Sequence, residues 1–248
     1  MTMLQMMMGA GGGTNIVTSG LILNLDAGSP SSYPGTGTTW TDLSGSGYNF
    51  TVQSGSWVSN GTASYFDFSG TYCCAKRVVG GALSNVPNFA NATLMVFSSI
   101  LNSTGNWRTL VRGSGADHQV IIQSGSNDLG MYDNDSNAYY SSGFNVTTIP
   151  NYTTKFNCLH WKLSQSSPYY SFGYNTIAAG TNITNGNATF NNGFCTIGAY
   201  HNGTTPVTSS TDASQYWGNV ALVLYYNRTL SDAEIAQNYN VFKGRYGV

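Results

Sequence analysis

The chain has 248 residues, of which 41% are hydrophobic and 8% are charged, and its formal net charge is −1. So few charges exclude a basic surface that would neutralise phosphates, and we expect no nucleic-acid binding. No apolar run approaches the roughly 18 residues that a transmembrane helix needs, so we expect no membrane insertion. The length and the hydrophobic share suit one all-β domain with a single large core.

The first thirteen residues differ in composition from the rest of the chain. They begin MTMLQMMM and end in a glycine-rich joint, Gly9 to Gly13. We expect no signal peptide here, because a basic segment and a cleavage site are both missing. Flexible thioethers fit irregular apolar grooves, so residues 1–13 are predicted to be a docking tail that binds a neighbouring subunit or another protein. The alternative is a tail folded back on its own domain. The docking side chains would be Met3, Leu4, Met6, Met7 and Met8.

Residues 14–248 have the periodicity of β-strands. Leu21, Leu23 and Leu25 alternate with Ile22, Asn24 and Asp26, which predicts that the three leucines lie on one face. Similar short runs, separated by Gly, Asn, Ser and Pro, predict antiparallel strands in one sandwich domain. The runs are SYFDF, ATLMVFSSI, WRTLV, HQVIIQ, LGMYD, FNCLHWKLS, YYSFGY, FCTIGAY and YWGNVALVLYYN. The cysteines are expected to be small buried residues rather than a disulfide framework: Cys73, Cys74, Cys158 and Cys195.

One helix is predicted after residue 230. Ser231 caps its start, and Glu234, three residues later, completes a capping box. Ile235 and Phe242 then fall on one face, and Gly244 is predicted to close the helix in the left-handed conformation. We expect this helix to pack across an edge of the sandwich.

Motifs near the two ends of the chain carry a resemblance to a known family. They are GLILNLDAG, SYPGTGTTWTDLSGSG and YFDFSG at the start and VALVLYYNRTLSDAEIAQNY at the end. Together they resemble the concanavalin A-like lectin/glucanase sandwich, in the laminin-G-like branch found in phage and other virus structural proteins. The resemblance covers about residues 20–246. It implies an all-β fold, an antiparallel jelly-roll sandwich with one C-terminal α-helix, and framework roles for Asp26, Trp40, Asp42 and Gly45.

The catalytic residues of that family are not matched. Its retaining glucanases need two carboxyl groups about 5 Å apart, and Glu234, the single glutamate, is assigned to the helix cap. Asp133 and Asp135 are the nearest other pair, and they fall in a predicted loop. No nucleophile elbow, phosphate loop or C-x-x-C pair occurs. We therefore predict that the chain is not an enzyme, with a glycoside hydrolase as the less favoured alternative.

The sequence gives only a weak indication of a metal site. Asp133, Asp135 and Asn137 have the spacing of oxygen ligands at the start of a calcium loop, and the laminin-G-like resemblance implies a rim calcium. No glycine follows them and no glutamate closes the loop, so a polar turn is favoured. We expect no cofactor, with Ca²⁺ at these three residues as the alternative. Zinc is not expected, and His160 is predicted to be a satisfied core histidine.

A sugar-binding surface is the remaining candidate site. The segments WRTLVRGSGADHQ and YDNDSNAYY place aromatic rings close to planar polar groups, which is the combination that a sugar ring requires. The alternative is that the arginines pair with nearby aspartates and rigidify the rim. The candidate carbohydrate-binding residues are Trp107, Arg108, Arg112, Asp117, His118, Asp133, Tyr139 and Tyr140.

These features predict a non-enzymatic virion structural or decoration protein at the surface of an extracellular particle, as part of the capsid surface, a head fibre or a tail. It is expected to be a homo-oligomer, to join other virion proteins through its tail and to bind host surface glycans weakly. The competing hypothesis is a secreted carbohydrate-binding lectin module. In that case Asn-x-Ser/Thr sites such as Asn91 and Asn145 would be glycosylated.

Overall fold

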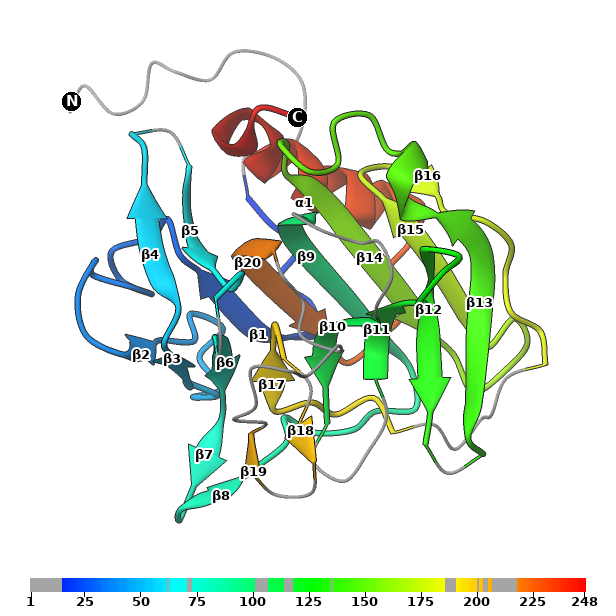
Figure 1. Cartoon of the computed structure of the whole chain (residues 1–248), viewed down its shortest axis with the longest axis horizontal. Helices are drawn as coiled ribbons and strands as arrows, with labels where there is room; N and C mark the ends of the chain where they lie inside the picture. The colour runs from blue at the N-terminus through cyan, green and yellow to red at the C-terminus, as the bar shows by residue number, and fades with distance from the viewer. Residues whose placement is uncertain are drawn as a thin grey trace.

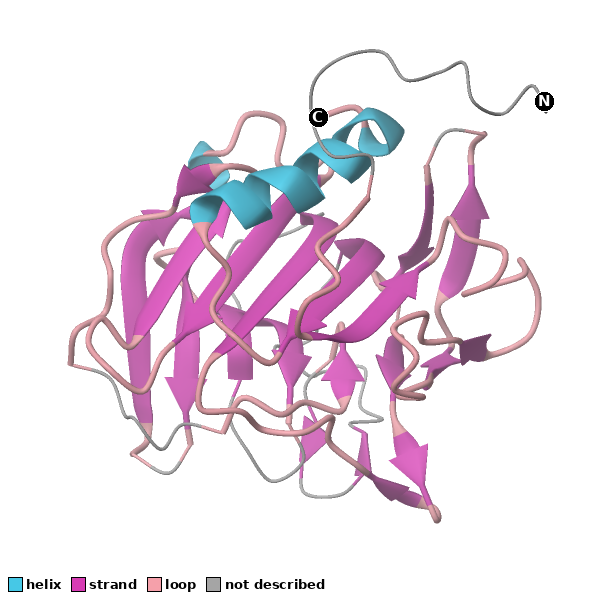
Figure 2. Ribbon diagram, turned by 180° about the vertical axis from the view of Figure 1, so that it is seen from behind, coloured by secondary structure: helices cyan, strands magenta, loops and turns pink. Residues whose placement is uncertain are grey.

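Two antiparallel β-sheets lie face to face, and one α-helix covers the outer face of the first sheet (Figures 1 and 2). This arrangement, seen in a computed structural model, confirms the predicted all-β sandwich with a C-terminal helix. The described residues are 15–61, 63–70, 73–100, 107–113, 118–134, 136–185, 191–199, 201–202, 205–206 and 218–248. The predicted docking tail, with its methionines, lies outside them.

The first sheet has β9 and β20 at its centre, and every residue of β9 is buried. A strand covered on both faces needs apolar side chains on both, which explains the continuous run ATLMVFSSI. In spatial order the strands are β16 (Ile177–Ala178), β15 (Tyr170–Tyr174), β14 (Asn157–Leu163), β9 (Ala92–Ile100), β20 (Gly218–Tyr226), β5 (Ser64–Asp67) and β4 (Ser56–Ser59), with β1 (Leu21–Asp26) paired to β20.

The second sheet forms the other layer of the sandwich. In spatial order its strands are β13 (Ala138–Asn145), β12 (Asp128–Asp133), β11 (His118–Ile122), β10 (Arg108–Arg112), β17 (Thr196–Ile197), β6 (Cys74–Lys76), β3 (Phe50–Gln53) and β2 (Thr39–Trp40). The remaining elements are two hairpins, β7 (Val78–Val79) with β8 (Ala82–Leu83) and β18 (His201–Asn202) with β19 (Thr205–Pro206), and the 3₁₀-helix η1 (Val146–Thr148).

Aromatic residues fill the core between the sheets. Trp40 is fully buried, and its ring lies 4.7 Å from Phe66 in an edge-on contact. The loop beside it is tied by Asp42, whose carboxylate accepts hydrogen bonds from the backbone amides of Asn24 and Ser44, both at 2.9 Å. The framework roles implied by the family resemblance for Trp40 and Asp42 are therefore confirmed.

Helix α1 (Asp232–Tyr246) begins as predicted but ends later. Ser231 and Glu234 form the capping box, whereas Gly247, with φ of +70°, closes the helix in place of the predicted Gly244. The extra turn forms because Tyr246 is buried, with its ring 5.1 Å from Phe97 of β9. The helix lies across the outer face of the first sheet and not across an edge, as Figure 2 shows.

All four cysteines lie in the described residues and are buried as thiols, which confirms that they are packing residues. Burial raises the pKa of Cys74 to about 12, so this thiol stays protonated and unreactive at neutral pH. In the described part of the chain, no helix has the length and apolar character needed to cross a membrane.

Candidate functional site

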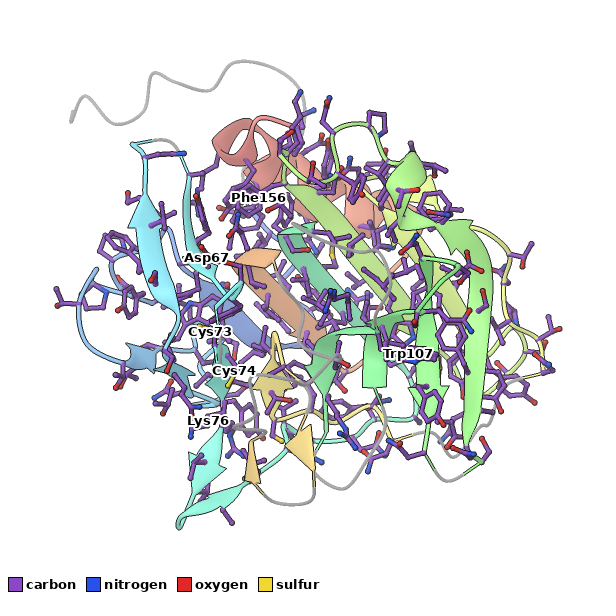
Figure 3. All side chains as sticks on the ribbon, viewed as in Figure 1. Asp67, Cys73, Cys74, Lys76, Trp107 and Phe156 are labelled. Carbon is purple, nitrogen blue, oxygen red and sulfur yellow. The ribbon has the colours of Figure 1, made fainter. Side chains whose placement is uncertain are left out.

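Three aromatic rings meet on the outer face of the second sheet, and we call them the aromatic cluster: Trp107, Tyr132 and Tyr139. Trp107 immediately precedes β10, and its ring centroid lies 5.2 Å from Tyr139 and 6.0 Å from Tyr132, both edge-on. Figure 3 shows Trp107 beside the strands of this sheet. All three side chains are half-buried, so each keeps part of its surface accessible.

Strand alternation explains which rings enter the cluster. Tyr132 and Tyr139 sit directly opposite each other in the β12–β13 pair, and Met131, next to Tyr132, points into the core. Tyr140 faces inward for the same reason and packs 5.9 Å from Tyr170. The sequence-based site therefore combined two tyrosines that lie on opposite faces of one strand.

Gly130 leaves the space in which the Tyr139 ring lies. A Cβ at this position would come within 2.5 Å of the Tyr139 hydroxyl and 2.3 Å of the Tyr140 carbonyl oxygen. The hydroxyl donates a hydrogen bond to the Asp128 carbonyl at 2.5 Å, which fixes the ring along β12. Burial is the main reason that the pKa of Tyr139 is raised, so the phenol remains a neutral donor.

Polar groups border the aromatic cluster. The Tyr132 hydroxyl donates to the side-chain oxygen of Asn137, and the Ser141 hydroxyl donates to the Asp128 carboxylate at 3.1 Å. Planar amide and carboxylate groups next to aromatic faces are the groups that recognise sugar hydroxyls. Tyr132, Asp128 and Ser141 were not among the residues predicted from the sequence. The hairpin register around the turn at residues 133–138 was the signal that would have found them.

The remaining predicted site residues are placed differently. Arg108 and Arg112 are 2% and 6% exposed, and burial lowers the pKa of Arg108. Asp133 is also buried, where it accepts hydrogen bonds from the backbone and hydroxyl of Ser136. These three side chains belong to the interior and not to the accessible part of the aromatic cluster. Asp117 and the side chain of His118 lie outside the described residues.

The predicted calcium loop forms a tight turn. Asn137 adopts a left-handed conformation, with φ of +51°, and its side-chain oxygen is engaged by Tyr132. Asp135 lies outside the described residues. Across the residues that the structure does describe, no group of three His, Cys, Asp or Glu side chains is arranged to hold a metal ion.

Glu234 forms part of the capping box at the start of helix α1. Its carboxylate accepts a hydrogen bond from the Ser231 amide at 2.9 Å and lies 2.5 Å from the Arg228 guanidinium. Arg228 first, and the Ser231 amide second, hold the pKa of Glu234 at about 2. A general acid needs the opposite shift, because it must keep its proton near neutral pH.

Comparison with solved structures shows the same fold at low sequence identity. A Trypanosoma rangeli sialidase in complex with sialic acid has a TM-score of 0.53 and 15% identity over 89% of this chain and 32% of the sialidase. The botulinum neurotoxin serotype D binding domain has a TM-score of 0.60 and 15% identity over 90% of this chain and 52% of the toxin domain.

Comparisons at the level of sequence give no relative: no protein-family model and no curated protein matches the chain. This chain spans about a third of the sialidases and about half of the toxin domain that it resembles. At these identities the likeness concerns the fold alone, which is a β-sandwich.

Proposed function

We propose that this chain is a non-catalytic carbohydrate-binding module and that the aromatic cluster is its sugar contact. The observation that carries the proposal is the meeting of Trp107, Tyr132 and Tyr139 on one accessible face, with ring centroids 5.2 and 6.0 Å apart. The apolar face of a sugar ring packs on such surfaces, and the neighbouring amide and carboxylate groups pair with its hydroxyls.

The composition and the fold support this ligand class. Only 8% of the residues in the chain are charged, so the protein offers little attraction to polyanions, whereas its 17 tyrosines and 5 tryptophans supply amphipathic rings. One structural neighbour is described as bound to sialic acid and another as a toxin binding domain, so sandwiches of this shape occur in sugar-bound and binding proteins. One fold can host many unrelated functions, so the geometry of the aromatic cluster, more than the shared fold, indicates the ligand class.

We also propose that this chain does not catalyse glycoside hydrolysis. Glu234, the single glutamate, is held by Arg228 and Ser231 with its pKa lowered to about 2, so it is a poor proton donor. Glycosidases of the usual kind need two carboxyl groups at a defined separation. We therefore expect no release of reducing sugar from any polysaccharide that the protein binds.

A glycan array probed with an oligomeric form tests the sugar contact, because weak single sites gain avidity when several act together. Trp107→Ala should weaken binding at least about tenfold, since a truncated aromatic anchor loses most of its contact. Trp57→Ala is the matched control: it removes another half-buried indole, on β4 of the first sheet. Binding that survives Trp107→Ala in a folded protein, or no binding by the oligomer, contradicts the proposal.

We further infer that the module is displayed on a virion through residues 1–13. The resemblance to phage and virus structural proteins and the methionine-rich start of the sequence support this attachment. Deleting residues 1–13 should leave a folded, soluble domain that no longer joins its assembly. A truncated chain that still incorporates normally contradicts the inference, and glycosylation of Asn91 or Asn145 in native material would favour a secreted lectin.

A further inference from the structure

Asparagine and threonine have an uneven spacing along the chain. Of the 26 asparagines, 10 are followed by threonine at the second position, although threonine makes up only 27 of the 248 residues. At the first position after asparagine, threonine occurs once. A composition rich in both residues would place about three threonines at each position. The excess therefore belongs to the triplet Asn-x-Thr, which begins at Asn49, Asn60, Asn91, Asn102, Asn145, Asn151, Asn182, Asn187, Asn202 and Asn227.

This triplet is the acceptor sequence for N-linked oligosaccharides when its middle residue is not proline. None of the ten triplets has proline in the middle. Serine can replace threonine in an acceptor, but it is used less efficiently. The chain has 29 serines, yet Asn-x-Ser occurs once, at Asn134. The preference for threonine over serine is the one that such acceptors show.

The asparagines of the triplets lie at the surface. Among the seven whose side chains the structure describes, six are exposed and Asn145 is half-buried. Other asparagines of the chain serve the interior: Asn157, Asn192 and Asn238 lie outside such triplets and are buried. An attached oligosaccharide needs an exposed asparagine, so the positions of the triplets suit it.

The fold alone explains some of the triplets. In one, the Thr147 amide donates a hydrogen bond to the Asn145 side-chain oxygen at 2.9 Å, and the Asn145 side-chain amide donates to the Ser126 carbonyl, also at 2.9 Å. In another, the Thr93 hydroxyl is buried and accepts a hydrogen bond from the Leu230 amide at 2.9 Å. These triplets have structural roles and do not indicate an acceptor.

The triplet at Asn182 has no such role. Its middle residue, Ile183, is buried and forms a bridge to Tyr170, whereas Asn182 and Thr184 on either side of it are exposed. Alternate residues of an extended segment point to one side, so both polar side chains face outward. Neither side chain has a hydrogen-bond partner in the part of the chain that the structure describes.

The triplet at Asn151 lies in the turn after η1. Asn151 is exposed and has a left-handed conformation, with φ of +57°, which itself favours asparagine. That conformation does not account for Thr153, which lies outside the strands. The side chains of Asn151 and Thr153 also make no hydrogen bond to any described residue.

We propose that Asn151 and Asn182 carry N-linked oligosaccharides. In the attachment step, the side-chain nitrogen forms a bond to the anomeric carbon of a sugar that is activated as a lipid-linked diphosphate. The bond from that carbon to the diphosphate oxygen breaks, the lipid diphosphate leaves, and the nitrogen gives up one proton. The donor and the transferase act outside the cytoplasm, so the chain has to cross a membrane. The inference goes beyond the proposed function, because it concerns sugars that the protein carries and not sugars that it binds.

Tandem mass spectrometry of peptides from the native protein tests the two sites. Peptides that contain Asn151 or Asn182 should carry an oligosaccharide mass on that asparagine. Asn240 is exposed on α1 and lies outside any triplet, so its peptide is the matched control and should be unmodified. An unmodified Asn151 or Asn182 overturns the assignment of that residue, and the absence of both modifications overturns the inference. Modification of Asn240 to the same extent would overturn the role of the triplet.

Variants of the full chain, exported from a eukaryotic cell behind a secretion signal, test the threonine hydroxyl. Thr184→Ala should remove nearly all of the oligosaccharide from Asn182, whereas Thr184→Ser should keep part of it. Thr176→Ala is the matched control, because Thr176 is exposed and follows Asn175 directly, outside a triplet. Thr184 is exposed and makes no hydrogen bond to a described residue, so all three variants should keep the urea midpoint of the wild type. Full occupancy of Asn182 in Thr184→Ala overturns the assignment.

A further arm separates this inference from the aromatic cluster. Trp107→Ala should leave the occupancy of Asn151 and Asn182 unchanged. A protein that carries both oligosaccharides and binds no glycan on the array would uphold this inference and contradict the proposed function. Loss of the oligosaccharides in a folded Trp107→Ala protein would overturn the independence of the two.

Discussion

Lowering the pH should destabilise this protein through His160 before its carboxylates begin to protonate. The residue is 8% exposed, and burial is the main reason that its pKa is lowered from 6.5 to about 4. Between those values the unfolded chain binds a proton on this ring and the folded chain does not. The stability that is complete above pH 6.5 is therefore lost progressively as the pH falls toward 4.

The size of the effect follows from these two pKa values. Because proton binding and folding are thermodynamically linked, the free energy of unfolding should fall by about 2 kcal/mol between about pH 7 and about pH 5. Glu234, whose pKa is lowered from 4.5 to about 2, contributes mainly below that interval. The lowered pKa of Asp232 acts in the same low range, because its ordinary value is 3.8. The interval therefore isolates histidine titration from the two helix-start carboxylates.

Urea unfolding at the two pH values, on the wild type and on His160→Phe, measures this contribution. Phenylalanine keeps a planar ring in the space above Gly173, where a Cβ would come within 2.0 Å of the imidazole, and does not titrate. The variant should lose about 2 kcal/mol less than the wild type over the same interval, and His118 and His201 contribute equally to both proteins. Equal losses in the two proteins would refute a buried neutral imidazole.

Other substitutions test the helix and the aromatic cluster by denaturant unfolding and glycan binding. Ser231→Ala should lower the free energy of unfolding by about 1 kcal/mol, because the helix loses its N-terminal cap. Ile235→Ala should lower it by about 2 to 5 kcal/mol, because this side chain is buried against the sheet. Two neutral results would contradict the packing of the helix. Gly244→Ala should stabilise the protein by up to about 1 kcal/mol, because Gly244 lies inside α1 and the space that a Cβ would occupy is open. A clear loss of stability would mean that the helix ends at Gly244. Gly130→Ala should cost about 1 to 3 kcal/mol and weaken glycan binding, because its Cβ would overlap the Tyr139 hydroxyl; unchanged binding would separate the aromatic cluster from sugar recognition.

The candidate site was only partly predictable, and the reasons are geometric. Trp107 and Tyr139 were found because their sequence segments are rich in aromatic and polar residues. Arg108 and Arg112 were included for the same reason, yet both are buried. Composition identifies a segment that could bind a sugar, whereas the direction of each side chain depends on strand register and on bulges, and β10 has two such irregularities against β11.

The sequence by itself determined the features that depend on neighbouring residues. The alternation of Leu23 and Leu25 in β1, the largely apolar run of β9 and the capping box of Ser231 with Glu234 all act within a few residues, so their patterns predict strands and a helix start. Leu21 does not share the face of the other two leucines, because the register shifts between Leu21 and Leu23. Only the tertiary structure decided that the helix continues to Tyr246, because Phe97, far away in the sequence, provides the surface on which that ring packs. It also decided that three rings converge on one face. His160 was predicted to be a satisfied core histidine, and it is buried over Gly173 of the neighbouring strand, but neither ring nitrogen has a hydrogen-bond partner among the described residues. Each of these outcomes depends on contacts between residues that are distant in the sequence, made by strand pairing or by packing of the helix on the sheet. Local patterns do not encode how such distant elements meet.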